Sequence, residues 1–280
     1  MKRLILLSII CISTLSCSSK IQKKNNQKFS KKDSTVLANM CSSLKAKTDY
    51  KIIDALLLFL NTPYVGKTLE VNNTEKLVIN LKQLDCSTFI ENGISLYKTA
   101  KSNNITLENF ATNIQTLRYR DGQINNYTSR LHYSSDWIYE NVKKGIIDNI
   151  TKELGGQTFK SNVSFMGNHP SKYKALKDEK YLAKIKEIED SINSRKYYYI
   201  PKNKVASIEN KLNDGDIIFI TTDYKGLDIS HVGFIIKQGQ KTHLLHASSK
   251  GKKVMISNKT LHYYLAGIKH DTGIIICRLK

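Results

Sequence analysis

Apolar residues recur at helical spacing through the first half of the chain and gather in short runs in its last third. The apolar stretch 50–60, which Thr62-Pro63 stops, predicts one helix. A second helix is predicted over 86–100, with Phe89, Ile90, Ile94 and Tyr97 on one face. Further helices are predicted at 106–118, with Thr106 as N-cap, at 134–144 and at 178–193, and a long loop at 122–133.

From residue 214 onward the pattern changes to apolar runs separated by turn residues, and each run predicts a strand. Gln238-Gly239 and Lys250-Gly251 are typical of hairpins, so the sheet is expected to be antiparallel. Helices followed by such strands predict an α+β fold in which the N-terminal helices pack on a C-terminal sheet. The five runs are DGDIIFITT, DISHVGFIIKQ, THLLHAS, KKVMIS and GIIICRL.

Residues 1–17 have the order of a bacterial secretory signal peptide. Lys2 and Arg3 precede an apolar run over 4–12, which is too short for a permanent membrane span. Cys17 follows Leu15-Ser16 as in a lipoprotein processing site, although Thr14 stands where such sites usually carry Leu. We therefore expect an exported protein of the periplasm or cell envelope, with a lipid anchor on Cys17 that holds it to the membrane.

Length and charge complete this outline. A chain of 280 residues suits one large domain, which we place at 50–280. Residues 18–49 are rich in lysine and are predicted to form a basic, solvated tether. The formal net charge of +20 suits anionic envelope polymers or lipid head groups, and no nucleic-acid partner is expected for an exported protein.

Three cysteines remain after the signal: Cys41, Cys86 and Cys277. Because the number is odd, at least one thiol stays free in a compartment that favours disulfides. A Cys41–Cys277 bridge is left open. Cys86 alone is compatible with a buried packing residue, half of a disulfide, or a nucleophile at a helix start.

Cysteine-dependent amide cleavage needs a thiol, a base and a group that orients the base. Cys86, His231 and His246 are candidates for these roles in that order, although each histidine alone would more often be a structural one. The two histidines fall in neighbouring predicted strands. Cys86 follows Asp85 at a predicted helix N-terminus, where we expect the helix dipole to lower the pKa of the thiol.

Longer segments carry a family resemblance. TPYVGKTLE (62–70), LDCSTF around Cys86, SRLHYSSDWI (129–138), YYIPK (198–202), NDGDIIFITT (213–222), GLDISHVG (226–233) and HASS (246–249) occur in this order. The chain thereby resembles the N-acetylmuramoyl-L-alanine amidase-like family of NlpC-type cell-wall cysteine hydrolases. The resemblance implies a papain-like fold with a family-specific helical insertion, and makes 50–280 a catalytic domain.

The resemblance also implies roles for single residues. Cys86 matches the nucleophile, His231 the general base and acid, and His246 the residue that orients His231. Substrate contacts are implied for Tyr64, Asp85, Ser87, Arg130, His132, Trp137 and Asp228. Each has a structural alternative: Tyr64 as a packing aromatic, Asp85 and Ser87 as helix caps, and Asp228 as a turn residue. Arg130 is expected to meet a substrate carboxylate, and His132 and Trp137 to stack on sugar or peptide.

The implied activity is hydrolysis of the amide between N-acetylmuramic acid and L-alanine in peptidoglycan or its fragments, the muropeptides. Two rivals stay open: an endopeptidase of the same clan that cuts between D-glutamate and the diamino acid, and a non-catalytic lipoprotein that binds wall fragments. The remaining histidines show no metal-binding spacing, so neither a metal nor another cofactor is expected.

Overall fold

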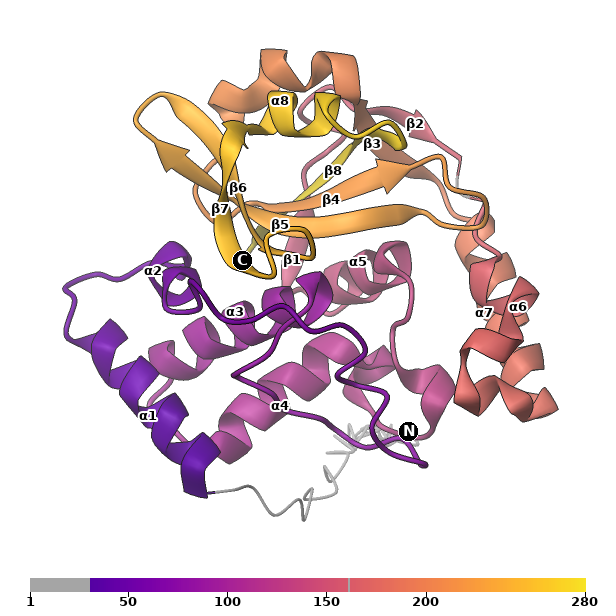
Figure 1. The fold of residues 1–280 in the computed structure, drawn as a ribbon, viewed down its shortest axis with the longest axis horizontal. Helices are drawn as coiled ribbons and strands as arrows, with labels where there is room; N and C mark the ends of the chain where they lie inside the picture. Colours follow the sequence, from indigo (N-terminus) through magenta and orange to yellow (C-terminus); the bar gives the residue numbers. More distant parts are fainter. Residues whose placement is uncertain (1–30, 161) are drawn as a thin grey trace, which may run out of the picture.

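The computed structural model describes residues 31–160 and 162–280, and in it one large antiparallel sheet is covered by helices on both faces (Figure 1). Helices α1 to α5 lie on one side of the sheet, α8 lies on the other, and α6 and α7 stand at one end. This confirms the mixed fold of helices and antiparallel sheet. The signal peptide, Cys17 and residues 18–30 of the predicted tether lie outside the described residues.

Eight α-helices occur in the described residues, and the helices predicted over 86–100, 106–118, 134–144 and 178–193 are among them. Thr106 caps α4 as predicted, since its side chain accepts a hydrogen bond from the N–H of Asn109. The helix expected over 50–60 is shorter. The α-helices are α1 (Lys31–Lys45), α2 (Ile52–Leu57), α3 (Cys86–Lys101), α4 (Leu107–Arg118), α5 (Ser134–Lys143), α6 (Phe165–Asn168), α7 (Glu179–Asn193) and α8 (Leu261–Ala266); the 3-10 helices are η1 (Arg120–Gly122), η2 (Tyr127–Ser129), η3 (Pro170–Lys172), η4 (Lys174–Lys177) and η5 (Lys202–Lys211).

The five predicted strands are present and antiparallel, but they do not form a simple meander. The sheet runs in the order β2-β3-β8-β4-β5-β6-β7, with β1 also paired to β8, so the last strand of the chain lies inside the sheet. Three short strands were not predicted. The strands are β1 (Ile147–Asn149), β2 (Gln157–Phe159), β3 (Tyr197–Pro201), β4 (Ile217–Thr222), β5 (Ile229–Gln238), β6 (Lys241–Ser248), β7 (Lys253–Thr260) and β8 (Asp271–Leu279).

Alternation along β4 explains its continuous apolar sequence. Ile217 and Phe219 belong to the core between the sheet and α3, whereas Ile218 and Ile220 belong to a second core on the opposite face. Successive side chains of a strand point to opposite faces, so a strand covered on both faces is apolar throughout. A third cluster lies under α6 and α7, which fall between Cys86 and His231 in the sequence.

The predicted tether is wrong for its second half. Residues 31–45 form α1, in which Leu37, Cys41 and Leu44 are buried in the main core. Their spacing of four and three residues aligns them on one helical face, which the lysine content of the segment obscured. Cys41 in α1 and Cys277 in β8 are separate free thiols, so no bridge joins them. In 31–160 and 162–280 none of the helices has the length and apolar character that crossing a membrane needs.

Candidate active site

Cys86 is the first residue of α3. Asp85 is the N-cap: its carboxylate accepts hydrogen bonds from the backbone N–H of Thr88 at 2.8 Å and from the Thr88 hydroxyl at 2.8 Å. Phe89 and Ile94 are fully buried against the sheet, and Phe89 packs edge-on against Phe234 of β5. The predicted apolar face therefore fixes α3, and with it Cys86, against the strand that carries His231.

His231 and His246 lie on neighbouring strands and form a hydrogen bond. Nε2 of His231 is 2.7 Å from Nδ1 of His246, with the two rings nearly perpendicular. Gly233 makes this approach possible, because a Cβ at that position would lie 3.0 Å from Cβ of His246. Since Nε2 of His231 is engaged by His246, Nδ1 is the ring nitrogen left for a reacting group.

Cys86 and His231 line one cavity of about 220 Å³. The pair therefore faces a common space, as the predicted roles require. Asp228 also lines this cavity, together with Met166 of α6 and Tyr173.

Burial keeps the Cys86 thiol and the rings of His231 and His246 uncharged in the free protein. It raises the pKa of the Cys86 thiol to about 11, while hydrogen bonds from the backbone of Val232 and from Ser87 act in the opposite direction. Burial lowers the pKa of His231 to about 3, assisted by the neighbouring His246, and it lowers that of His246 to about 4. The expected lowering of the thiol pKa at the helix N-terminus is therefore wrong for the net shift, because burial outweighs the groups that lower it.

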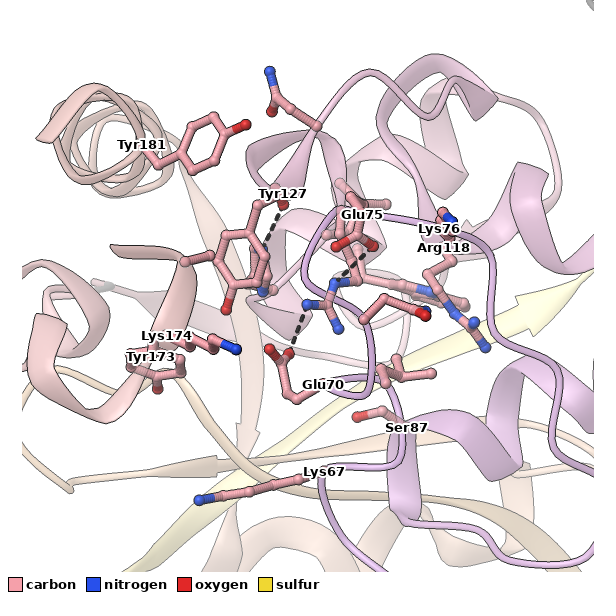
Figure 2. Close-up of a pocket in the computed structure, with 18 of the residues that line it drawn as sticks. Lys67, Glu70, Glu75, Lys76, Ser87, Arg118, Tyr127, Tyr173, Lys174 and Tyr181 are labelled. Atoms are coloured by element: carbon pink, nitrogen blue, oxygen red, sulfur yellow. Dashed lines mark hydrogen bonds and ion pairs between the residues drawn. The ribbon is translucent and has the colours of Figure 1, made fainter. Parts of the chain in front are cut away.

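A second cavity of about 870 Å³ adjoins the first (Figure 2). The residues common to both walls are Ser87, His132, Ser134, Tyr173 and Val232. Ser87 follows the candidate nucleophile, so the large cavity begins directly beside Cys86. Its size is typical of small-molecule sites, about 300–1,000 Å³.

Comparison with known proteins agrees with this geometry. A family model described as N-acetylmuramoyl-L-alanine amidase-like matches residues 55–274. The chain belongs to this family.

Solved structures agree with the family match. An N-acetylmuramoyl-L-alanine amidase from Bacteroides uniformis ATCC 8492 is 38% identical with a TM-score of 0.78, over 82% of this chain and 99% of that one. A Bacteroides fragilis protein provisionally named a xylanase is 38% identical with a TM-score of 0.76, over 80% of this chain and 99% of that one. LPG0564 from Legionella pneumophila, 22% identical with a TM-score of 0.64 over 89% of this chain and 94% of that one, shares the fold. No curated protein matches the chain.

Tyr64 of this amidase-like chain lies beside the candidate nucleophile, where it was predicted. Its segment pairs in parallel with Leu84, two residues before Cys86. Burial raises the pKa of the Tyr64 phenol, and the charges of Cys86 and Asp85 add to the shift. The phenol is therefore a neutral hydrogen-bond donor next to the thiol.

Arg130 lines the large cavity, but the chain itself supplies its counter-charges. Its Nη2 is 2.6 Å from Glu70 and its Nε is 3.2 Å from Glu75, and its side chain is only 6% exposed. In Figure 2 these two contacts are the dashed lines that end at Glu70 and Glu75. This pairing leaves no unmatched positive charge at Arg130 for a substrate carboxylate, contrary to the expectation from sequence.

The other predicted contacts have structural partners too. His132 lines both cavities, but its Nε2 is 2.8 Å from the Tyr127 carbonyl oxygen and burial lowers its pKa to about 3. Trp137 is 6% exposed and packs on Phe219, so it belongs mainly to the core. Asp228 accepts hydrogen bonds from the N–H groups of Ser135, in the first turn of α5, and of Ile229. Asp228 therefore caps the first turn of α5 and also lines the small cavity.

Sequence reasoning missed several residues of the site. Tyr264 of α8 packs edge-on against His246 at 5.3 Å, and burial raises its pKa to about 12. Glu70 ends the segment TPYVGKTLE that carried the resemblance, and Tyr127 lies in the long loop predicted at 122–133. The described residues contain no group of three or more histidine, cysteine or carboxylate side chains suited to a metal ion.

Proposed function

We propose that this chain is a cysteine-dependent amidase that cleaves the bond between the lactyl group of N-acetylmuramic acid and L-alanine in muropeptides. The observation that carries the proposal is a thiol at a helix N-terminus that shares a cavity with His231, whose ring is hydrogen-bonded to His246 behind it. Membership of the amidase-like family supports the choice of bond. A papain-like, NlpC-type classification is part of the proposal, supported by the packing of α3 against the strands that carry both histidines.

The first chemical step is coupled to proton transfer. The Cys86 thiol is neutral at rest, so its proton passes to Nδ1 of His231 as Sγ attacks the lactyl carbonyl carbon. His246 holds the His231 ring by the 2.7 Å hydrogen bond and supports the imidazolium that forms. His231 then gives the proton to the alanine nitrogen as the C–N bond breaks, which leaves a thioester.

The oxyanion of the tetrahedral intermediate is stabilised by groups that are already in place. The first backbone N–H groups of a helix lack intrahelical partners, and Asp85 takes only that of Thr88. The N–H of Cys86 is therefore one candidate donor to the oxyanion, and the Tyr64 hydroxyl is a second. In the last step water, deprotonated by His231, hydrolyses the thioester and releases the lactyl carboxylate and the free thiol.

Digestion of defined muropeptides with mass spectrometry of the products tests the activity. The proposal expects free stem peptide and peptide-free sugar, and expects Cys86→Ala to abolish both while binding persists. Products in which L-alanyl-D-glutamate stays on the sugar would instead establish the rival endopeptidase. Binding without turnover by the wild type would establish the non-catalytic alternative. Lys98→Ala, an exposed change on the same helix, is the control.

Export and lipid anchoring remain a proposal supported by residues 1–17 alone. Incorporation of labelled fatty acid into the wild type and its loss in Cys17→Ser would support the anchor. Incorporation in both would assign the lipid to another residue, and incorporation in neither would refute the anchor.

A further inference from the structure

The wall of the large cavity carries two carboxylates that an arginine holds in place, and several lysines. Arg130 is held between Glu70 and Glu75, and Glu75 also accepts a hydrogen bond from the Tyr119 hydroxyl at 2.6 Å. These contacts fix the carboxylates, and each carboxylate keeps acceptor capacity for a ligand. The Glu75 side chain is only 7% exposed, whereas Glu70 and the lysines of the wall are exposed to solvent. These lysines are Lys67, Lys76, Lys172, Lys174 and Lys177.

Tyr127 contributes a hydroxyl that lacks a protein partner. The side chain is only 5% exposed, and among the described residues its buried oxygen has no hydrogen-bond partner. Figure 2 shows Tyr127 in the cavity wall, with its side chain pointing into the space near Glu70 and Lys174. Because a buried hydroxyl is normally hydrogen-bonded, this group is suited to a polar ligand group.

The position of His231 determines which half of the substrate reaches this cavity. His231 must protonate the departing amine, so the leaving peptide lies on the His231 side of Cys86, where the small cavity is. The acyl half then extends past Ser87, into the large cavity. Its hydroxyl and N-acetyl groups offer the donors that Glu70, Glu75 and Tyr127 can accept.

We propose that the large cavity is a glycan subsite that binds the muramic acid ring and the sugar linked to it, and that the Tyr127 hydroxyl and Glu70 determine this specificity. The inference rests on the proposed function, because that function defines the acyl half as the sugar. The occupant that competes with it is the stem peptide, whose carboxylates the exposed lysines would attract. Against the peptide, two of the polar groups lining the cavity, Glu70 and Glu75, are carboxylates that would repel it.

The test compares two substrates with the same scissile bond. One is a disaccharide muropeptide, and the other is the matching N-lactyl peptide, which lacks the sugars. Tyr127→Phe keeps the packed ring and removes only the hydroxyl, so the ratio of kcat/KM for the muropeptide to that for the lactyl peptide is expected to fall about tenfold. Glu70→Gln is expected to lower the same ratio. Tyr224→Phe, at an exposed tyrosine outside both cavities, controls for the loss of a phenol.

Binding of the peptide-free disaccharide to the Cys86→Ala protein, measured by calorimetry, provides a second readout. Binding that weakens about tenfold with Tyr127→Phe supports the subsite, even if the wild type hydrolyses neither substrate and the proposed function fails. Hydrolysis of both substrates with an unchanged ratio in both variants overturns the subsite and leaves the function intact. A loss of kcat/KM that is equal for both substrates would place the stem peptide in this cavity and also overturn the inference.

Discussion

Gly93 lies where α3 packs most closely on α2, and replacing it with alanine tests this contact. A Cβ at position 93 would lie 2.3 Å from Cδ2 of Leu56 and 3.8 Å from Cε2 of Phe234. Ordinary contact begins at 3.4 Å, so Leu56 or the helix must move by 3.4 − 2.3 = 1.1 Å. Leu56 is fully buried, which leaves its methyl group little free space.

The magnitude follows from two opposing terms. Overpacking a core costs roughly 1–3 kcal/mol, whereas alanine in place of glycine inside a helix gains about 1 kcal/mol. Gly93→Ala is therefore expected to lower the free energy of unfolding by about 0–2 kcal/mol. In a Leu56→Ala background the clash disappears, and the same change should raise the free energy of unfolding by about 1 kcal/mol.

Urea denaturation of the wild type, Gly93→Ala, Leu56→Ala and the double variant measures the coupling free energy between positions 93 and 56. Cys86 is 93 − 86 = 7 residues, or two helical turns, from Gly93, so displacement of α3 should also lower kcat. A stabilisation by Gly93→Ala that is equal in both backgrounds would show that α3 and α2 are further apart than described, and would refute the reasoning.

Three further predictions follow from the buried polar groups. His246→Ala should lower kcat about 100-fold with an unchanged KM, since it removes the hydrogen bond that orients His231, and steady-state kinetics with circular dichroism checks this. Because burial lowers the pKa of His231, kcat/KM should hold its neutral-pH value down to about pH 5, and an acid limb at the ordinary histidine pKa of about 6.5 would contradict it. Arg118→Met leaves Glu91 buried without its ion pair and should cost about 3–5 kcal/mol of unfolding free energy. That cost should shrink at lower pH, because burial raises the pKa of Glu91 and favours its protonated form, and a cost independent of pH would argue against an unpaired carboxylate.

Local signals made much of the fold predictable. Periodicity located α3, α4, α5 and α7, and apolar runs located β4 to β8, because each depends on residues close in the sequence. The order of the strands depends on pairing between distant segments: β8 inserts between β3 and β4, and no turn signal encodes that. Helix α1 was missed because it lies in the lysine-rich segment 18–49, although only one face of a helix has to be apolar to be buried.

The candidate site was also predicted only in part. Cys86, His231 and His246 were identified because this chemistry requires particular residue types, and the hydrogen bond between the histidines agrees with their predicted roles. The partners of Arg130 were not found, because Glu70 is 60 residues away and Glu75 is 130 − 75 = 55 residues away in the sequence. Arginine in a motif suggests a substrate anion, yet a buried guanidinium needs counter-charges in the free protein, and here the chain provides them.

Two opposing effects, burial and the helix N-terminus, act on the pKa of the Cys86 thiol. A helix N-terminus stabilises a nearby anion by about 0.3–1 kcal/mol, and by up to about 2 kcal/mol when partly buried. The net rise of the Cys86 pKa from 9.0 to about 11 corresponds to roughly 3 kcal/mol at about 1.36 kcal/mol per unit, so burial outweighs the helix. In the proposed mechanism the helix N–H groups are then free of a resting thiolate and act on the oxyanion, which exists only during the reaction and is where stabilisation raises the rate. Alkylation of Cys86 by iodoacetamide at neutral pH should accordingly be slower than that of a free peptide thiol and should rise with pH above the usual midpoint of about 8.5. Faster alkylation at neutral pH would reveal a resting thiolate and refute this mechanism, whereas Cys86→Ala identifies any background labelling of Cys41 and Cys277.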